Sequence, residues 1–370
     1  MKKIQIYLLL WLLIPSAFAQ TADRWQGFRG NQGLTGVSPV ALPERPALLW
    51  KYQTGDNIKS SPVVCNNRIV IASTDGKVYC LDMQGKELWK FESPNAFEAP
   101  ALILDNRVYI GNMDGTLYAL ELATGRKIWE YVTDNQIVGA VNWWKSDNRT
   151  YLLVGSYDYY LHCVDASSGK SVWKYESDNF INGAAAAVNG QAIFGGCDGF
   201  LHVVDIRSGS LIRKINVETY VAGSTAVEGS RAWFGDYDGK FSSVDLQRGE
   251  RVWRWEDPQV RLPFIASPAV AGNRVITGNH DKHIYAFDKN SGAMLWKYNT
   301  GNRVEASPIV VGTRVLTANM RGDLHLLNLA SGQPVWSYEL GAAVIGNPAV
   351  ANGRIFIGAN DGVVYCFGAR

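Results

Sequence analysis

The chain has 370 residues, with 36 basic and 34 acidic side chains and a formal net charge of +2 at neutral pH. The charges are scattered along the chain, without a block of one sign. Such a surface supplies little of the counterion-release energy on which nucleic-acid binding depends, so we expect no nucleic-acid partner.

The first 19 residues have the pattern of a secretory signal peptide. Lys2 and Lys3 are followed by an apolar run over residues 6–14, and Ala17-Phe18-Ala19 fits a cleavage site. The apolar run is shorter than a membrane-spanning helix requires. Position 20 is Gln, whereas bacterial lipoproteins carry their lipid on a cysteine there. We therefore expect a soluble exported protein, periplasmic or secreted, without a lipid anchor and with no transmembrane segment in the mature chain.

An irregular lead-in is predicted over residues 20–46, because three prolines lie between positions 39 and 46. Trp25, Phe28 and Arg29 indicate that this lead-in packs on the domain that follows. Residues 47–53, which contain Trp50, then predict a strand of β-branched, aromatic and leucine residues.

Seven segments of the remaining chain repeat one pattern: an apolar residue, usually followed by an aspartate, then a tight turn with glycine, and a tryptophan. Their last positions are 40 to 44 residues apart and are Trp89, Trp129, Trp173, Arg213, Trp253, Trp296 and Trp336. A period of this length with strand-like runs throughout is typical of a β-propeller. Arg213 departs from the series and predicts a weak seam or an altered surface between the fourth and fifth units.

Each unit contains four short strand-like runs, with a hairpin turn between the second and third. Eight such turns occur, so we expect eight four-stranded antiparallel blades. The turns are Asp75-Gly76, Asp114-Gly115, Asp158-Tyr159, Asp198-Gly199, Asp238-Gly239, Asp281-Lys282, Arg321-Gly322 and Asp361-Gly362. The chain ends just after the third run of the last unit. We therefore predict that residues 47–53 supply its outer strand and close the ring.

The repeated motif, best preserved at residues 121–129, resembles the tryptophan-docking repeat of quinoprotein (PQQ-like) β-propellers over about residues 47–370. Two branches of that superfamily matter: the pyrroloquinoline-quinone dehydrogenases, and the non-enzymatic BamB-type propeller of the outer-membrane assembly machinery. The segment Trp25-Gln26-Gly27-Phe28-Arg29-Gly30 is also similar to exported proteins with quinone-like propeller repeats.

The resemblance to the dehydrogenases implies a quinone and Ca²⁺ in the ring centre, with an aspartate base and commonly an adjacent-cysteine disulfide. Adjacent cysteines are absent from this sequence. The positions expected to line the central funnel are Lys59, Phe97, Val138, Asn182, Ala222, Ile265, Glu305 and Ile345. Only Glu305 among them is acidic, which is too few oxygen ligands for calcium. We expect no cofactor; PQQ and Ca²⁺ belong only to the dehydrogenase alternative.

Most other polar candidates fall on repeat positions, where structure explains them. His162, His202 and His325 take the place of tyrosines in other units, which favours packing over metal binding. The aspartates that precede the tight turns are expected to cap those turns. Among the five cysteines we expect buried thiols, with a Cys80–Cys366 bridge as the alternative if their Cα atoms lie within about 7 Å. The odd count leaves at least one thiol unpaired.

Function is expected where the repeat is interrupted. One insertion lies near Trp143-Trp144 in the third unit, and a longer connection over residues 257–264 precedes the sixth. Loops on rigid scaffolds carry function, and aromatic residues and arginine are enriched at interfaces. Trp143 and Trp144 could equally pack beneath their own loop. The candidate binding residues are Lys59, Trp143, Trp144, Asn182, Arg261, Phe264, Arg303 and Glu305; no catalytic or metal-ligating residue is assigned.

The sequence thus predicts a signal peptide (1–19), a lead-in (20–46) and an all-β, eight-bladed propeller (47–370). The favoured function is a non-catalytic scaffold that binds a protein of the cell envelope. The alternatives are a quinoprotein dehydrogenase acting on alcohols or sugars, and a carbohydrate-binding propeller that uses Trp143 and Trp144.

Overall fold

The computed structural model describes residues 23–146, 148–221 and 223–370. The predicted signal sequence (1–19), Asp147 of the insertion and the funnel position Ala222 lie outside the described residues. The described chain is built from strands, and none of its described segments is a helix long and apolar enough to cross a membrane.

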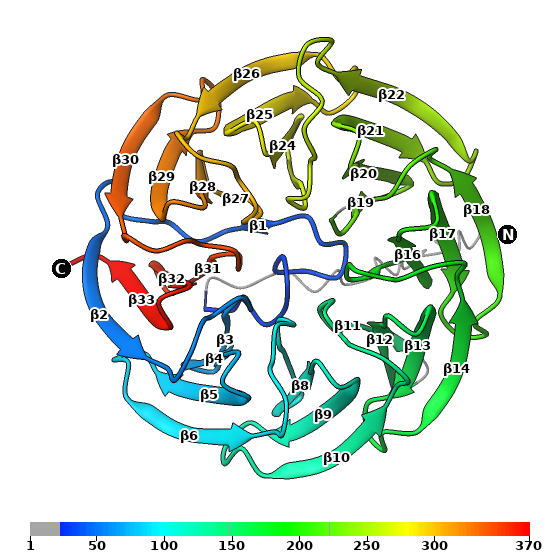
Figure 1. The fold of residues 1–370 in the computed structure, drawn as a ribbon, viewed down its shortest axis with the longest axis vertical. Coiled ribbons are helices and arrows are strands. Elements are labelled where there is room, and N and C mark those ends of the chain that lie inside the picture. Colours follow the sequence, from blue (N-terminus) through cyan, green and yellow to red (C-terminus); the bar gives the residue numbers. More distant parts are fainter. Residues whose placement is uncertain (1–22, 147, 222) are drawn as a thin grey trace, which may run out of the picture.

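Eight sheets stand around a central axis as the blades of a propeller (Figure 1), which confirms the predicted fold class. The strands of blades 1 to 4 are β3 (Val63–Cys65), β4 (Arg68–Ala72), β5 (Lys77–Asp82), β6 (Glu87–Glu92), β7 (Leu102–Leu104), β8 (Arg107–Gly111), β9 (Thr116–Glu121), β10 (Lys127–Val132), β11 (Asn142–Ser146), β12 (Arg149–Gly155), β13 (Tyr160–Asp165), β14 (Ser171–Glu176), β15 (Ala186–Val188), β16 (Gln191–Gly195), β17 (Phe200–Asp205) and β18 (Leu211–Asn216).

Blades 5 to 8 follow the same plan. Their strands are β19 (Ala226–Glu228), β20 (Arg231–Gly235), β21 (Lys240–Asp245), β22 (Glu250–Glu256), β23 (Ala269–Ala271), β24 (Arg274–Gly278), β25 (His283–Asp288), β26 (Met294–Asn299), β27 (Ile309–Val311), β28 (Arg314–Ala318), β29 (Asp323–Asn328), β30 (Pro334–Glu339), β31 (Ala349–Ala351), β32 (Arg354–Gly358) and β33 (Val363–Gly368), together with β2 (Ala47–Gln53). Within each blade, neighbouring strands are antiparallel.

The ring is closed by β2, the strand that precedes the first blade in sequence. It pairs antiparallel with β33, placing Trp50 opposite Cys366, and lies along the outside of blade 8 (Figure 1). The N-terminal strand therefore supplies the outer strand that the C-terminal unit lacks, as predicted. Because β33 is paired on both sides, by β2 and by β32, the third strand of the last blade is not left as an unpaired outer edge.

The repeated tryptophan and glycine explain how one blade attaches to the next. Trp89 of blade 1 donates its indole N–H to the carbonyl of Leu122 in blade 2, at 2.9 Å. Its ring lies against Gly125, where a Cβ atom would be only 2.5 Å from a ring carbon. Gly125 has a φ of +74°, so glycine is needed there both for space and for backbone conformation. The same ring-on-glycine contact recurs at Gly85, Gly169, Gly209, Gly292 and Gly332.

The contact between blades 4 and 5 is formed by Arg213, the residue that replaces the repeated tryptophan. Gly249 is retained in blade 5, and Arg213 lies over it in place of a tryptophan, with its Cδ 2.9 Å from the position of a Cβ. The Arg213 Nε atom is buried and has no hydrogen-bond partner among the described residues. The aliphatic stem thus occupies the ring position without replacing the indole hydrogen bond.

A second set of contacts joins the blades near the axis, where backbone N–H groups donate to side chains of the next blade. The five bonds, of 2.5 to 3.0 Å, are Ala184 to Ser224, Ser224 to Ser267, Ser267 to Ser307, Ser307 to Asn347 and Asn347 to Ser61. The last of them crosses from blade 8 to blade 1. This belt therefore reinforces the closure that β2 makes at the outer edge.

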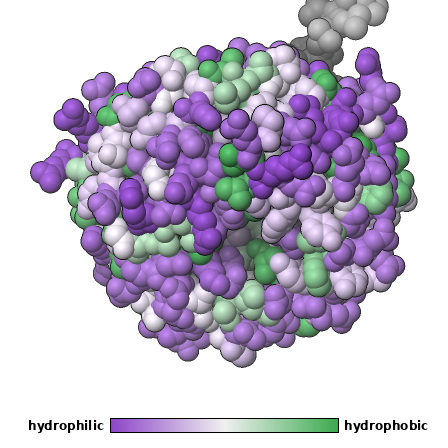
Figure 2. Space-filling model, turned by 45° about the horizontal axis from the view of Figure 1, so that its top comes forward, coloured by the Kyte–Doolittle hydropathy of each residue, from purple (hydrophilic) through white to green (hydrophobic). Residues whose placement is uncertain are grey.

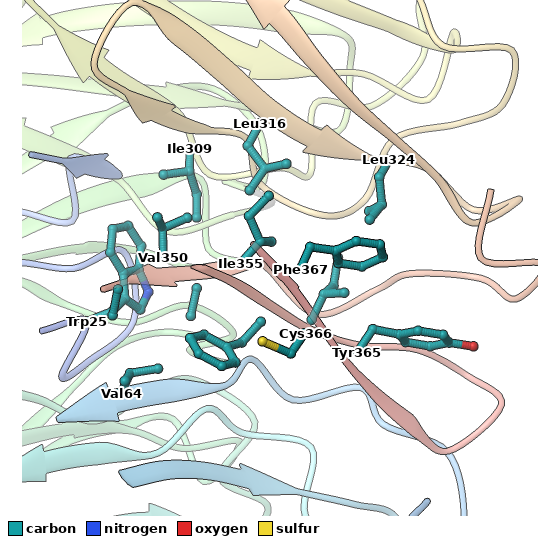
Figure 3. Close-up of a cluster of buried hydrophobic side chains, with 14 of the residues drawn as sticks. Trp25, Val64, Ile309, Leu316, Leu324, Val350, Ile355, Tyr365, Cys366 and Phe367 are labelled. Carbon is teal, nitrogen blue, oxygen red and sulfur yellow. The ribbon is translucent and has the colours of Figure 1, made fainter. Parts of the chain in front are cut away.

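The lead-in closes the centre of the ring, and we call residues 25–38 the plug. Its backbone bonds to the middle residue of the inner strand in six blades: Val64, Ile103, Ala187, Val227, Val270 and Val310. Its last two residues form β1 (Val37–Ser38), which pairs parallel with β27. Trp25 belongs to one buried cluster with Val64 and Val350 (Figure 3). Packing of the lead-in on the propeller is thereby confirmed.

The remaining repeat residues are structural, as expected. Asp165 caps its turn by accepting backbone N–H bonds from Ser167 and Ser168, and the other turn aspartates do the same. His162 is fully buried, with Nδ1 3.0 Å from the Tyr131 hydroxyl and Nε2 3.0 Å from Asp158.

All five cysteines are free thiols, so the Cys80–Cys366 bridge is not formed. Cys80 and Cys366 are both fully buried and lie in different hydrophobic clusters. Burial also raises the pKa of the Cys80 thiol to about 12. Four of the thiols, those of Cys65, Cys80, Cys163 and Cys366, are buried and pack as small apolar side chains, whereas Cys197 is partly exposed.

Candidate functional site

The two faces of the ring are different. Each hairpin turn between second and third strands lies beside the connection that leads into the next inner strand; for example, Ser93 donates its N–H to the Gly76 carbonyl at 2.9 Å. We call this side the hairpin face. The connections that carry the expected funnel positions, such as Lys59 and Glu305, lead into the inner strands on this side. The space-filling view shows a hollow near the middle of the molecule (Figure 2).

One funnel position differs from the prediction. Phe97 is fully buried in the core between blades 1 and 2, so it does not line the funnel. Glu98, the next residue, corresponds to Lys59, Val138, Asn182, Ile265, Glu305 and Ile345 in the other blades. Each lies nine residues after its tryptophan, except Ile265, which follows the lengthened connection. Counting from the tryptophan would have identified Glu98 in the sequence.

The acidic residues of the funnel mouth are both paired. Glu98 accepts a hydrogen bond from the Lys59 ammonium at 2.6 Å. Glu305 lies 3.2 Å from the Arg303 Nε and 3.6 Å from the His280 Nε2. On the other side of the mouth, the Asn182 amide donates to the Cys197 sulfur at 3.1 Å. Four candidate residues, Lys59, Asn182, Arg303 and Glu305, thus share the hairpin face.

The other candidates divide between surface and core. Trp143 and Trp144 lie on β11, whose lengthened hairpin with β12 projects on the opposite face, beside the turns at Asn66 and Asp105. Trp143 is 5% exposed and Trp144 packs against the core between blades 3 and 4. In the connection over residues 257–264, Arg261 is exposed, but Phe264 is only 1% exposed. The Phe264 ring is part of the core of blades 5 and 6, which corrects the expectation that it is presented for binding.

A group of rings and apolar side chains on the hairpin face, exposed except for the half-buried Tyr157 and Phe180, was not recognised in the sequence. We call it the aromatic arc; it spans blades 3 to 6 and consists of Tyr157, Tyr159, Phe180, Tyr220, Tyr237, Val260 and Leu262. Tyr220 and Tyr237 are 50% and 47% exposed, and their ring centres are 6.5 Å apart. Tyr157 stacks on Phe180 at 4.7 Å.

The arc is confined to one half of the ring. The corresponding hairpins of blades 1 and 2 are Ser73-Thr74-Asp75-Gly76 and Asn112-Met113-Asp114-Gly115. A comparison of turn residues between units, with attention to Tyr157 and Tyr237, would have revealed the arc. Exposed aromatic residues gathered on one face are typical of interaction surfaces.

Asp236 lies beneath the arc and is 1% exposed. Blades 6 and 7 have asparagines at this position, and Asn279 and Asn319 donate their side-chain N–H to the carbonyls of Leu262 and Thr300. A carboxylate cannot donate such a bond. Burial raises the pKa of Asp236 to about 6; the Lys240 N–H and ammonium oppose the shift and Asp238 adds to it.

Replacing Asp236 with asparagine is expected to stabilise the protein at neutral pH. The folded chain holds the Asp236 proton more tightly than the unfolded chain, so the contribution of Asp236 to stability is fully present below pH 4 and is lost as the pH rises through about 6. D236N should therefore raise the free energy of unfolding by about 2 kcal/mol at pH 7.5 and by little at pH 4. Urea unfolding at the two pH values measures this, with the exposed neighbour D238N as control. A gain that is equal at both pH values would contradict the assignment.

The described residues do not fit a quinone–calcium site. Calcium takes six to eight oxygen ligands, whereas Glu98 and Glu305 are each engaged by basic side chains. No group of three or more His, Cys, Asp or Glu side chains that could hold a metal ion occurs within residues 23–146, 148–221 and 223–370.

The fold and the docking repeat define the chain as a PQQ-like repeat β-propeller. It belongs to the family described as outer membrane protein assembly factor BamB, whose model matches residues 40–142, 139–255 and 280–370. A comparison with curated proteins finds no match.

Solved structures share this architecture at low sequence identity. BamB from Moraxella catarrhalis is 20% identical, with a TM-score of 0.74 over 88% of this chain and 98% of that chain. The computationally designed Ika8 protein is 17% identical, with a TM-score of 0.75 over 86% and 98%. Quinohemoprotein alcohol dehydrogenase from Comamonas testosteroni is 14% identical, with a TM-score of 0.79 over 95% and 82%. At these identities the likeness shows the fold alone.

Proposed function

We propose that this chain is a non-catalytic scaffold of the cell envelope, exported as a soluble protein, which binds a protein partner in outer-membrane protein assembly. The observation that carries the proposal is the aromatic arc on the hairpin face. Family membership supports a role in outer-membrane protein assembly, because the family is described as an outer membrane protein assembly factor. The predicted signal sequence supports export.

The arc has the properties of a protein-binding surface. Tyrosines such as Tyr220 and Tyr237 offer large contact areas at low conformational cost and are frequent at the energetic centres of interfaces. Arg261, exposed on the adjoining connection, supplies a charged group at the edge. The rigid ring below the arc fixes these side chains, so little ordering is needed on binding.

A photo-crosslinking side chain at position 220 tests this function in the living cell. We expect an adduct with an outer-membrane assembly protein from position 220 and none from position 88, where Leu88 is similarly exposed (44%) on the outer strand β6. Y220S combined with Y237S should weaken the isolated complex about 30-fold or more, since an interface aromatic contributes about 2 kcal/mol. Equal adducts from positions 220 and 88 would contradict the proposal.

The proposal includes no bound cofactor, and the paired acids of the funnel mouth support this. The quinoprotein dehydrogenase remains the alternative, and it makes the opposite prediction: dye-linked oxidation of alcohols or sugars after addition of PQQ and Ca²⁺. The carbohydrate alternative gains no support, because Trp143 does not offer its ring face to solvent.

A further inference from the structure

The hairpin of blade 3 is longer than the corresponding hairpins of the other blades. β11 has five residues and β12 seven, whereas the first and second strands of the seven other blades have three and five. Tyr151 pairs with the turn aspartate Asp165, as the first residue of the second strand does in blade 1. The added residues are therefore 145, 146, 149 and 150, and they carry the hairpin beyond the level of the plug.

The added part of β11 has a free inner edge. Ser146 and Arg149 form the last pair before the hairpin turn, and Lys145 lies one residue before that pair. Val64 and Ile103 hold the same place in blades 1 and 2, and their backbone N–H groups donate to the plug. Because the direction of backbone groups alternates along a strand, the Lys145 N–H and C=O also point away from β12. Among the described residues, no backbone group on that side bonds to them.

A groove lies beside this edge. It has a volume of about 300 Å³ and is bordered by β11, by the turns of blades 1 and 2, and by the start of the plug. Its lining includes Gln26, Asn66, Asn106, Trp143 and Lys145. The Lys145 side chain is 36% exposed. The groove is open to solvent, so a ligand can reach the edge of β11.

The plug shows what the inner edges of this propeller bind. In six blades an extended backbone segment bonds to the inner strand, and its last residues pair with β27 as a parallel strand. At blade 3 the plug instead meets a side chain, because the Asn142 amide donates to the Gln32 carbonyl at 2.9 Å. The inner edge of blade 3 also extends past the segment that occupies the others. An exposed edge of this kind is a template for the addition of a strand from another chain.

The side chains of β11 indicate which strand fits. Lys145 and Trp143 are two residues apart and so share one face, with the Lys145 Nζ 5.7 Å from the centre of the Trp143 ring. The ammonium also lies 2.9 Å from the Asp105 Oδ1, which keeps it at the groove. Opposite charges at facing positions stabilise neighbouring strands. An acidic residue therefore fits opposite Lys145, and an apolar residue fits two places along, toward Trp143.

We propose that β11 pairs with an extended polypeptide segment of a partner, which carries an acidic residue opposite Lys145 and an apolar residue opposite Trp143. Without the partner, the charge of Lys145 protects the edge from unspecific pairing. The groove lies on the face opposite to the aromatic arc. This site is therefore additional to the proposed function and does not depend on the arc.

Titration calorimetry of the full chain with the blocked peptide Thr-Val-Thr-Glu-Thr-Val-Thr tests the site, and we expect the peptide to bind. Two further forms are methylated at the backbone nitrogen of the glutamate or of the threonine before it. Since alternate N–H groups point to opposite sides of a strand, one form should bind at least tenfold more weakly and the other should retain most of the affinity.

Variants of the chain locate the peptide. Deletion of residues 145, 146, 149 and 150, which gives blade 3 a hairpin of the usual length, should abolish binding. K145Q should weaken binding about threefold, the size expected for one cross-strand charge pair. The control is K289Q, because Lys289 is likewise paired with an acidic residue, Glu228, on the same face. It should leave the affinity unchanged.

Equal affinities of the two methylated peptides, or no binding of the unmodified one, would overturn the proposal. So would binding that survives the deletion in a variant that circular dichroism shows to be folded. If the deletion variant does not fold, the methylated peptides still decide, because they are measured on the wild-type chain. Loss of peptide binding in Y220S combined with Y237S would place the peptide on the arc and also overturn the proposal. Unchanged binding in that variant supports a site separate from the arc.

Discussion

Removal of residues 20–53 is expected to abolish cooperative unfolding of the propeller. The deletion takes away β2, the plug and the Trp50 contact with blade 1, where the indole donates to the Met83 carbonyl at 3.0 Å. It also exposes the buried cluster that joins blades 7, 8 and 1, including Val350 and Phe367. The expected loss is on the order of 5 kcal/mol or more, comparable to the whole stability of a domain. Differential scanning calorimetry measures it.

Two further variants distinguish the contribution of β2 to stability from that of the plug. Deletion of residues 20–46 keeps β2, and we expect it to retain a cooperative transition at a lowered melting temperature. A permuted chain that carries residues 47–53 after Arg370, joined through a turn like that at residues 83–86, should recover most of the stability lost with the strand. If the chain without residues 20–53 melted at the wild-type temperature, closure by β2 would contribute nothing.

The repeat in the sequence was sufficient to predict the number of blades and the closing strand. The pattern succeeds because each unit buries its faces only against its neighbours, so the same residues recur at every seam. Residues 47–52 match the outer-strand residues 88–91, and the last unit lacks a fourth run, which together are enough to place β2 in blade 8. The turn aspartates, such as Asp165, are local devices and were also predicted correctly.

The candidate site could be predicted less well than the fold from the sequence. Trp143 and Phe264 stood out by residue type, yet burial depends on the neighbouring blade, which no local pattern describes. Phe97 was assigned to the funnel although it lies eight residues after Trp89, one residue before the equivalent position, and Glu98 was missed for the same reason. Tyr220 and Tyr237 come from different loops and become neighbours only when the ring forms. The position of the plug around Arg29 could not be predicted either, because its hydrogen-bond partners come from the inner strands of six different blades.

Substitution of the glycine beneath each tryptophan by alanine is expected to destabilise the protein more than the left-handed backbone alone would. Gly292 and Gly272 are both in blade 6 and have φ values of +74° and +58°. An alanine at either position incurs the cost of a left-handed backbone, about 1 kcal/mol. At Gly292, however, a Cβ would lie 2.6 Å from the Trp253 ring, whereas nothing lies within 4 Å at Gly272. Overpacking of this kind adds about 2 kcal/mol.

G292A should therefore lower the free energy of unfolding by about 3 kcal/mol, and G272A by about 1 kcal/mol, in urea denaturation. The ring has little room to retreat, because Trp253 is 8% exposed and its indole N–H is held by the Lys289 carbonyl at 3.1 Å. In a W253A background the steric part should disappear, so G292A and G272A should then cost the same. An equal cost of the two substitutions in the wild-type chain would mean that the ring moves freely. The tryptophan–glycine contact would then not be what holds one blade to the next.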